Sequence, residues 1–227
     1  MGVSARAGSH LLSGLPEPIS TDLFEKARPV QLAADKVLFL EGDPGDGCYR
    51  VDRGLLKVSV ISSTGGERIL AILGPGAVVG ELAILDELPR SASVTAIRDS
   101  QLRFVSRQQF AAIAKTHPEI YRHITSLLAA RLRDTNTVVA AASFLPLKGR
   151  VARALVDLAS AFGEDVGESR VLIRQKISQS DVAAMAGIAR ENVSRILNEW
   201  IREKLISRVS GYYCLENKAA LEEAAKL

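Results

Sequence analysis

Short stretches rich in apolar and β-branched residues dominate the chain between Val37 and Phe104. The stretches are KVLFLEGD, CYRVDRGLLKVSVI, ERILAILG, SASVTAI and QLRFVS, and glycine-bearing turns lie between them: GDPGDG, SSTGGE and GPGAVVG. Many short strands joined by tight turns are typical of β-sandwiches and barrels. The pattern therefore predicts a β-rich domain in the first half of the chain.

The periodicity becomes helical after Ser106. Residues 107–120, RQQFAAIAKTHPEI, predict a short helix, and Pro118 suits the first turn of a longer helix that runs to about Phe144. The apolar positions of the longer helix recur in steps of three and four: Ile124, Leu128, Leu132, Val139 and Ala142. Thr135 takes the missing position in this stripe. A single stripe of this kind favours a two-stranded coiled coil in a homodimer over packing of the helix on its own β-domain.

The segment SFLPLKGR interrupts the helix, because Leu145 precedes Pro146 and is biased away from helical conformation. Pro146 suits the start of the next helix, LKGRVARALVDLASAFG, and the following GEDVGES predicts a loop. We therefore expect a β-domain over residues 12–117, a long dimerisation helix over 118–144 and a second domain over 145–227.

Residues 179–198, QSDVAAMAGIARENVSRILN, match the pattern of a helix-turn-helix. Ala183 is small where the two helices would cross, and Gly187 opens the turn. The positions expected to be buried are apolar: Val182, Ala186, Ile188, Val193 and Ile196. A generic helical hairpin is the alternative, but it leaves unexplained the residues on the exposed side of the second helix: Arg190, Glu191, Asn192, Ser194 and Arg195.

These exposed residues suit the reading of DNA. A helix that enters the major groove N-terminus first brings its first turns to the base edges. Arg190 and Arg195 can each donate two hydrogen bonds to guanine, and Glu191 can accept one from cytosine. Ser178 and Gln179, at the entrance to the first helix, suit phosphate contacts, although Ser178 suits a plain helix N-cap equally well.

The distribution of charge agrees with a polyanion partner for the second half of the chain. Asp and Glu are frequent through residues 17–99, whereas residues 148–208 carry many Lys and Arg, within a formal net charge of +3. Downstream of the helix-turn-helix, KLISRVSGYYCLE predicts a β-hairpin that turns near Ser210 and Gly211. Such a hairpin would form a wing beside the DNA backbone.

Composition excludes several classes of protein. With 47% apolar and 24% charged residues in 227, the chain can bury proper cores. Cys48 and Cys214 lie far apart in sequence and outside any CxxC or Cys/His cluster, which argues against a disulfide framework or a zinc site. No apolar stretch approaches the ~20 residues of a membrane span. We therefore expect a cytoplasmic protein without a membrane partner.

Two features of the sequence point to a known family: the motif GELAILDELPRSA at residues 80–92 and the order of the expected elements. The chain resembles bacterial transcription regulators of the cyclic-AMP receptor protein (CRP/FNR) family from about Leu12 to the wing. The resemblance implies an α+β fold with an N-terminal double-stranded β-helix (jelly-roll-like) cyclic-nucleotide-binding domain, a dimerisation helix and a C-terminal winged helix-turn-helix. It implies double-stranded DNA and RNA polymerase as partners, and no enzymatic activity.

The motif is similar to the family's phosphate-binding cassette, which implies contacts to a cyclic nucleotide from five residues: Gly80, Glu81, Leu82, Arg90 and Ser91. Gly80 allows close approach of the backbone, and Arg90 suits a charge-assisted, bidentate contact to the cyclic phosphate. Glu81 would accept a hydrogen bond from the ribose 2′-hydroxyl. An ordinary ion pair between Glu81 and Arg90, closing a loop, is the alternative.

The resemblance also assigns two residues of the long helix to the nucleotide. Thr135 matches the residue that hydrogen-bonds the purine, and Asn136 matches the residue that reaches the nucleotide from the partner subunit. The family's best-known cyclic-AMP receptor has serine at the latter position, so Asn136 is a departure that bears on the choice between adenine and guanine. We expect cyclic AMP as the ligand and keep cyclic GMP as the alternative. In the recognition helix, RENVSR combines features of two branches of the family and predicts a near-palindromic site with a TG-containing half-site.

Rival functions depend on residues that the chain lacks. An iron–sulfur sensor needs an N-terminal cysteine cluster, and residues 1–30 contain no cysteine. A haem sensor needs axial ligands, and the three histidines, His10, His117 and His123, are not suitably placed. We therefore expect no metal, haem or iron–sulfur cluster. A regulator that is active without ligand stays open, whereas a cyclic-nucleotide-regulated enzyme or channel would leave the helix-turn-helix unexplained.

Overall fold

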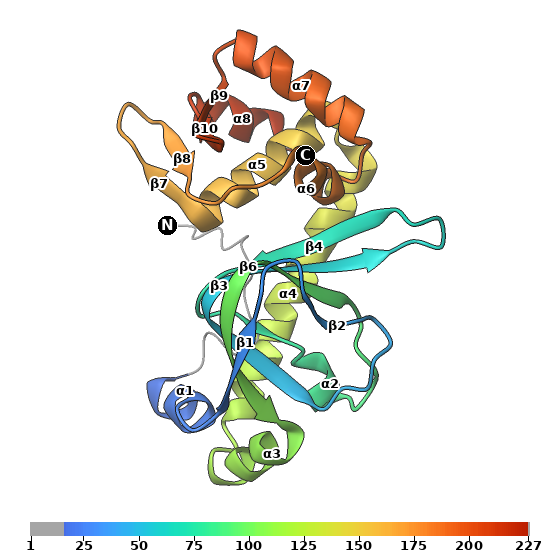
Figure 1. The fold of residues 1–227 in the computed structure, drawn as a ribbon, viewed down its shortest axis with the longest axis vertical. Coiled ribbons are helices and arrows are strands. Elements are labelled where there is room, and N and C mark those ends of the chain that lie inside the picture. The colour runs from blue at the N-terminus through green and yellow to red at the C-terminus, as the bar shows by residue number, and fades with distance from the viewer. Residues whose placement is uncertain (1–15, 227) are drawn as a thin grey trace. The chain divides into compact units, whose positions relative to one another are not determined.

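The computed structural model describes residues 16–226, except for the side chains of residues 127, 130, 131 and 134 (Figure 1). Contacts divide this part of the chain into two compact units, residues 16–133 and 134–226. The division falls inside the long helix α4 (Ile120–Phe144). The predicted start of the β-domain at Leu12, and His10, lie outside the described residues.

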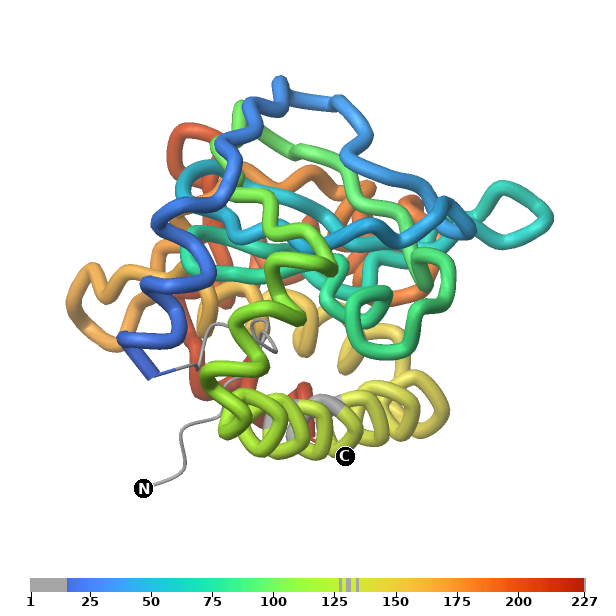
Figure 2. Tube along the Cα trace, turned by 90° about the horizontal axis from the view of Figure 1, so that it is seen from below, coloured from blue at the N-terminus to red at the C-terminus, as the bar shows by residue number. Residues whose placement is uncertain are grey.

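The first unit is built on one antiparallel sheet whose strands pair in the order β1-β6-β3-β4, while β2 also pairs with β6, and β5 with β3. The six strands are β1 (Arg28–Leu32), β2 (Val37–Phe39), β3 (Gly47–Ile61), β4 (Glu67–Leu73), β5 (Val78–Val79) and β6 (Ser93–Ser106). The hairpin between β3 and β4 extends beyond the rest of this unit (Figures 1 and 2). The predicted β-rich domain is confirmed.

Two features of the sheet differ from the sequence prediction. SASVTAI and QLRFVS form one continuous strand, β6, because Arg98 and Gln101 keep their pairing with β3 across register shifts. The strand β1, residues 28–32, lies before the stretch predicted to be β-rich. Its side chains are mostly exposed, so it lacks the apolar pattern of the other strands.

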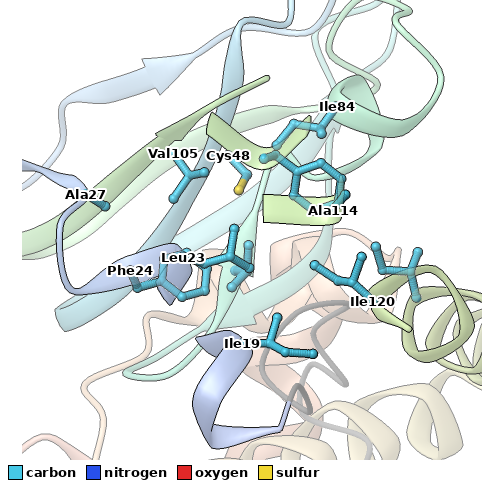
Figure 3. Packing of buried hydrophobic residues seen from close by; sticks show 12 residues of the cluster. Ile19, Leu23, Phe24, Ala27, Cys48, Ile84, Val105, Ala114 and Ile120 are labelled. Atoms are coloured by element: carbon cyan, nitrogen blue, oxygen red, sulfur yellow. The ribbon is translucent and has the colours of Figure 1, made fainter. Parts of the chain in front are cut away.

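Three helices accompany the sheet: α1 (Glu17–Phe24), α2 (Leu82–Leu85) and α3 (Arg107–Thr116). Together with the start of α4 they close an apolar core around Cys48 and Val105, to which α1 contributes Phe24 (Figure 3). Helix α3 is confirmed, and a capping box of Ser106 with Gln109 fixes its start.

The beginning of α4 is part of the same core. Ile120 and Ile124 are both buried against it. Ile124, predicted as the first residue of the dimer stripe, is thus covered by its own unit. The next positions of the stripe, Leu128, Leu132 and Val139, have exposed side chains. The exposed part of the stripe therefore begins at Leu128.

The second unit contains the end of α4, four helices and a small antiparallel sheet of order β7-β8-β10-β9. Its helices are α5 (Leu147–Phe162), α6 (Gln179–Ala186), α7 (Arg190–Arg202) and α8 (Lys218–Ala224). Its strands are β7 (Gly163–Asp165), β8 (Val171–Ile173), β9 (Ile206–Val209) and β10 (Tyr212–Leu215). Helix α5 contacts the other three helices. None of the helices in the described residues combines the length and apolar character needed to cross a membrane.

Two predictions for the start of this unit have different outcomes. Pro146 stands at the N-cap of α5, as predicted, and Leu145 separates the two helices. The stretch GEDVGES was predicted as a loop, and this prediction is wrong at its beginning: residues 163–165 pair with β8. The sequence did not indicate this strand because its side chains are acidic. An edge strand exposed to solvent needs no apolar residues.

Candidate functional site

A buried arginine, Arg90, organises the site in the first unit. Its side chain is almost fully enclosed, with the residue only 4% exposed. Nη1 donates hydrogen bonds to the carbonyl oxygens of Gly47 at 2.7 Å and Gly80 at 2.9 Å. Nη2 donates to a carboxylate oxygen of Asp46 at 2.9 Å. The guanidinium is therefore held between the start of β3 and the cassette.

One face of this guanidinium lies against an aromatic ring. The Arg90 Cζ atom is 4.2 Å from the centroid of the Phe39 ring, and Phe39 in turn contacts Tyr49. The Arg90 Nε atom is buried and has no hydrogen-bond partner within the described structure. A stacked, buried guanidinium with an unused donor is suited to hold an anion.

The cassette itself begins with a glycine that no other residue can replace without rearrangement. Gly80 has φ of +82°, and a Cβ atom there would lie 2.4 Å from the Arg90 Nη1. Glu81 follows as the N-cap residue of α2 and is only 5% exposed. The Glu81 carboxylate and the Arg90 guanidinium are thus buried in the same small segment of the fold. Burying such charges costs folding free energy unless they are paired and hydrogen-bonded.

The burial also affects Cys48, next to the cassette in the core. Burial, and after it the Glu81 carboxylate, raises the pKa of the Cys48 thiol well above its usual value. The thiol is therefore neutral and unsuited to act as a nucleophile at neutral pH. Among the described side chains there is no group of three or more His, Cys, Asp or Glu that could hold a metal ion.

The predicted nucleotide residues fall into two sets. Gly80, Glu81, Leu82 and Arg90 are brought together in the first unit, and Ser91 follows them with an exposed side chain. Thr135 and Asn136 are exposed residues of α4 on the other side of the division between the units. Their contact with a nucleotide stays a prediction.

Sequence reasoning missed three residues around Arg90. Asp46, Gly47 and Phe39 are its partners, yet they lie about 40 to 50 residues earlier in the chain. The stretch GDPGDG was seen only as a turn. A carboxylate placed directly before a long apolar strand was the available signal.

In the second unit, α6 and α7 form the predicted helix-turn-helix. Gly187 ends α6 in the left-handed conformation, with φ of 66°, and its N–H donates to the Ala183 carbonyl. The predicted buried positions Val182, Ala186, Val193 and Ile196 are buried, whereas Ile188 is only partly so. The start of α6 is fixed by a capping box in which the Ser178 hydroxyl accepts from the Asp181 N–H.

The predicted DNA-reading residues lie on the outer side of this motif. Arg190, Glu191 and Arg195 are exposed, Gln179 and Ser194 are partly buried, and Ser178 is exposed. The Arg195 Nη2 lies 3.3 Å from the Asn192 side-chain oxygen, a contact that orients the guanidinium within the helix. The side chains expected to reach base edges are thus on one accessible surface.

The predicted wing is the hairpin of β9 and β10. Val209 pairs with Tyr212, and Ser210 and Gly211 between them have φ of 53° and 85°, as a two-residue hairpin turn requires. Arg208 and Lys176 each lie over a tyrosine ring of β10, the Arg208 Cζ at 4.7 Å from the Tyr213 centroid.

Comparison with known proteins agrees with both halves of this description. Residues 29–117 match the cyclic nucleotide-binding domain family, and residues 149–224 match the Crp-like helix-turn-helix domain family. The chain is 34% identical over 219 residues to the "Cyclic AMP receptor protein" of Thermus thermophilus, a match that covers 96% of this chain and 97% of that one. It is 31% identical over 219 residues to the "CRP-like cAMP-activated global transcriptional regulator" of Mycobacterium tuberculosis, with coverage of 96% and 93%.

Solved structures lead to the same family. A CRP/FNR-family transcriptional regulator from Thermus thermophilus matches with a TM-score of 0.70 and 26% identity, over 87% of this chain and 98% of that chain. FixK2 from Bradyrhizobium japonicum matches with a TM-score of 0.78 at 21% identity, over 88% and 98%, which supports the fold alone. The expected fold class, a cyclic-nucleotide-binding β-domain followed by helices and a helix-turn-helix domain, is confirmed. The chain belongs to the CRP/FNR family of bacterial transcription regulators, which bind DNA and are not enzymes.

Proposed function

We propose that this regulator is a homodimer that binds cyclic AMP and, in response, changes the orientation of its DNA-binding helices. The observation that carries the proposal is the buried Arg90, enclosed by the cassette and left with an unpartnered Nε donor. The anion that now pairs with this guanidinium is the Asp46 carboxylate, which is largely exposed, and a cyclic phosphate with its single negative charge would replace it.

The roles of the cassette residues follow from their chemistry. Arg90 would donate charge-assisted hydrogen bonds to the phosphate, and Gly80 would let the backbone approach it. Glu81 would accept from the ribose 2′-hydroxyl, and Ser91 would supply a hydroxyl and an amide. The Asp46 side chain is 68% exposed, so it can turn into solvent and release the Nη2 of Arg90 to the phosphate.

Cyclic AMP is the preferred nucleotide because two relatives that match nearly the whole chain are named as a cyclic AMP receptor and a cAMP-activated regulator. Asparagine at position 136 keeps a second candidate, cyclic GMP, open. Its side-chain amide can both donate and accept, so it can pair with either purine edge. Thr135 would hydrogen-bond the purine in either case.

Dimerisation through α4 is supported by the exposure of its apolar stripe. The side chains of Leu132 and Val139 are 63% and 60% exposed in the single chain. A second copy of the helix would cover them in a parallel coiled coil. Nucleotide bound near Thr135 and Asn136 would register this coiled coil and favour the DNA-competent state. To shift the ratio of DNA-competent to inactive protein from 1:99 to 99:1, the nucleotide must bind the DNA-competent state more tightly by about 5.5 kcal/mol.

The two recognition helices α7 of such a dimer would enter successive major grooves about 34 Å apart, on a near-palindromic site. Arg190→Ala should cost about 1 to 3 kcal/mol in DNA binding and relax one base position. An equal loss for all sequences would make Arg190 a phosphate contact instead. RNA polymerase is the further partner, and the cytoplasm the location, that membership of the family implies.

Calorimetric titration of the purified protein with cyclic AMP and with cyclic GMP tests the proposal. Tight binding that Arg90→Ala abolishes is the expected result, and the ratio of the two affinities decides between the nucleotides. If neither nucleotide binds, the ligand proposal fails, and a regulator that binds DNA without a nucleotide takes its place.

A further inference from the structure

A second arginine, Arg107, ties together the segments that surround Arg90. Its Nη2 donates hydrogen bonds to the carbonyl oxygens of Gly45 at 2.8 Å and Ala83 at 2.9 Å. Its backbone N–H donates to the Asp46 carbonyl at 3.0 Å. Arg107 is the first residue of α3, so one residue connects the loop before β3, the cassette helix α2 and the helix α3.

The loop before β3 and the helix α2, both bound by Arg107, contact each other very closely. A Cβ atom on Gly45 would lie 2.1 Å from the Ala83 Cβ, so only glycine allows the contact. Helix α2 has four residues, and carbonyl groups of its last turn lack partners within the helix. The cationic side chain of Arg107 supplies a donor to one of them, which stabilises the C-terminal end of α2.

The same loop supplies the groups that hold Arg90. Gly47 and Asp46 accept hydrogen bonds from its side chain. Its backbone is fixed to the loop as well: the Arg90 N–H donates to the Asp43 carbonyl, and the Gly42 N–H donates to the Arg90 carbonyl, both at 2.8 Å. The position of the Arg90 guanidinium therefore depends on the loop of residues 42–47, and Arg107 fixes that loop on α2.

We propose that Arg107 is a positioning residue for nucleotide binding. It does not touch the ligand. It keeps the acceptors around Arg90, and the cassette helix, in the arrangement that presents the guanidinium to the phosphate. This inference rests on the proposed function, because it concerns the same phosphate site. A purely structural arginine would lower the melting temperature of the protein without changing the affinity of the folded protein for nucleotide.

Calorimetric titration with cyclic AMP at 25 °C, on wild type and on Arg107→Met and Arg107→Lys, tests the inference. Methionine keeps the apolar stem of the side chain and removes its donors, and lysine restores the charge and an ammonium group with three N–H donors. We expect Arg107→Met to weaken binding about tenfold, as is common when a residue that supports a binding site is lost. Arg107→Lys should recover most of that loss.

Arg103→Met is the matched control. Arg103 also donates to a backbone carbonyl, that of Glu25, and pairs with Asp52, but neither partner belongs to the phosphate site. Its variant should bind cyclic AMP as wild type does. If Arg107→Met does not fold, Arg107→Gln, which keeps an amide NH2 group but no charge, takes its place and must also bind more weakly than wild type.

The outcomes separate the two proposals. If wild type binds cyclic AMP and Arg107→Met binds it equally well, Arg107 is structural only and the inference is overturned. The inference is also overturned if lysine fails to recover affinity. If wild type binds neither cyclic AMP nor cyclic GMP, it is the proposed ligand that fails.

Discussion

Gly80 shows how strongly one residue constrains the proposed phosphate site. Alanine at this position is unfavourable for two reasons. At φ of +82° a Cβ atom strains the backbone, and that atom would lie 2.4 Å from the Arg90 Nη1. The strain alone costs about 1 to 2 kcal/mol. We expect Gly80→Ala to lose that stability and to bind cyclic nucleotide at least about tenfold more weakly, because Arg90 must move. Urea unfolding and calorimetric titration measure the two effects.

The control for this prediction is Gly76→Ala. Gly76 has φ of +85° but open space where a Cβ atom would lie. It should lose a similar amount of stability and keep the affinity for nucleotide. Equal affinity losses in both variants would mean that the displaced Arg90 is not the cause.

The buried thiol of Cys48 predicts a pH dependence of stability. Burial first, and the Glu81 carboxylate second, raise its pKa in the folded protein. The folded state therefore keeps a proton that the unfolded chain releases above about pH 8.5. The stabilisation is present below that pH and is lost as the pH rises, at up to about 1.4 kcal/mol per pH unit.

Comparing wild type with Cys48→Ala isolates this contribution. The alanine variant is less stable at neutral pH because it leaves a cavity, but its stability should fall less steeply between about pH 8 and pH 10. Urea unfolding at several pH values gives the slope for each protein. Parallel slopes would show that Cys48 ionises in the folded state as readily as in the unfolded one.

The limits of sequence reasoning are also visible in single residues. Gly80, Glu81 and Arg90 could be predicted together because they share one short motif. Asp46 and Arg107, which hold the loop and the guanidinium in place, could not, because their relation to the motif exists only through pairing of β3 with β6 and packing on α2. Contacts between distant segments depend on the fold, and a local signal such as the carboxylate before β3 does not say which distant residue it meets.

At the scale of elements, the start of α6 offers a prediction that separates two roles of Ser178. The hydroxyl accepts from the Asp181 N–H and thereby caps the helix. We expect Ser178→Ala to cost about 1 kcal/mol of stability, whereas Ser178→Asn, which keeps a capping oxygen, should cost little. Thermal unfolding of the two variants measures this difference.

DNA binding by the same variants tests the second role. If the Ser178 hydroxyl also contacts phosphate, both variants should bind DNA more weakly than wild type, in an assay such as fluorescence anisotropy at fixed salt. If DNA affinity is the same in Ser178→Ala and wild type, Ser178 is a helix cap alone.

The elements differ in how well the sequence predicted them. Helices α3 and α7 and the wing carry strong local signals, namely a capping box, helical periodicity and a Ser-Gly turn, and they occur where predicted. Strand β7 and the middle of β6 are polar, and pairing with neighbouring strands is what makes them extended. Tertiary pairing can override local preference in strands more readily than in long helices.

For the whole molecule, the decisive question is whether α4 pairs with a second copy of itself. Leu132 lies in the apolar stripe and is 63% exposed in the single chain. Aspartate there costs the isolated chain little, because the side chain is already in solvent. In a coiled coil it would place two carboxylates opposite each other and remove two buried leucines, each worth about 1.5 to 3 kcal/mol.

We therefore expect Leu132→Asp to dissociate the dimer at micromolar concentration, as measured by sedimentation equilibrium, while its circular dichroism stays that of a folded chain. Ser126→Asp adds the same charge to an exposed position off the stripe and should stay dimeric. The monomeric variant should also lose most of its affinity for a two-half-site DNA, because each α7 would then bind alone. A Leu132→Asp protein that remains dimeric would place the dimer interface elsewhere, and with it the proposed contact of Asn136 with the partner's nucleotide would fail.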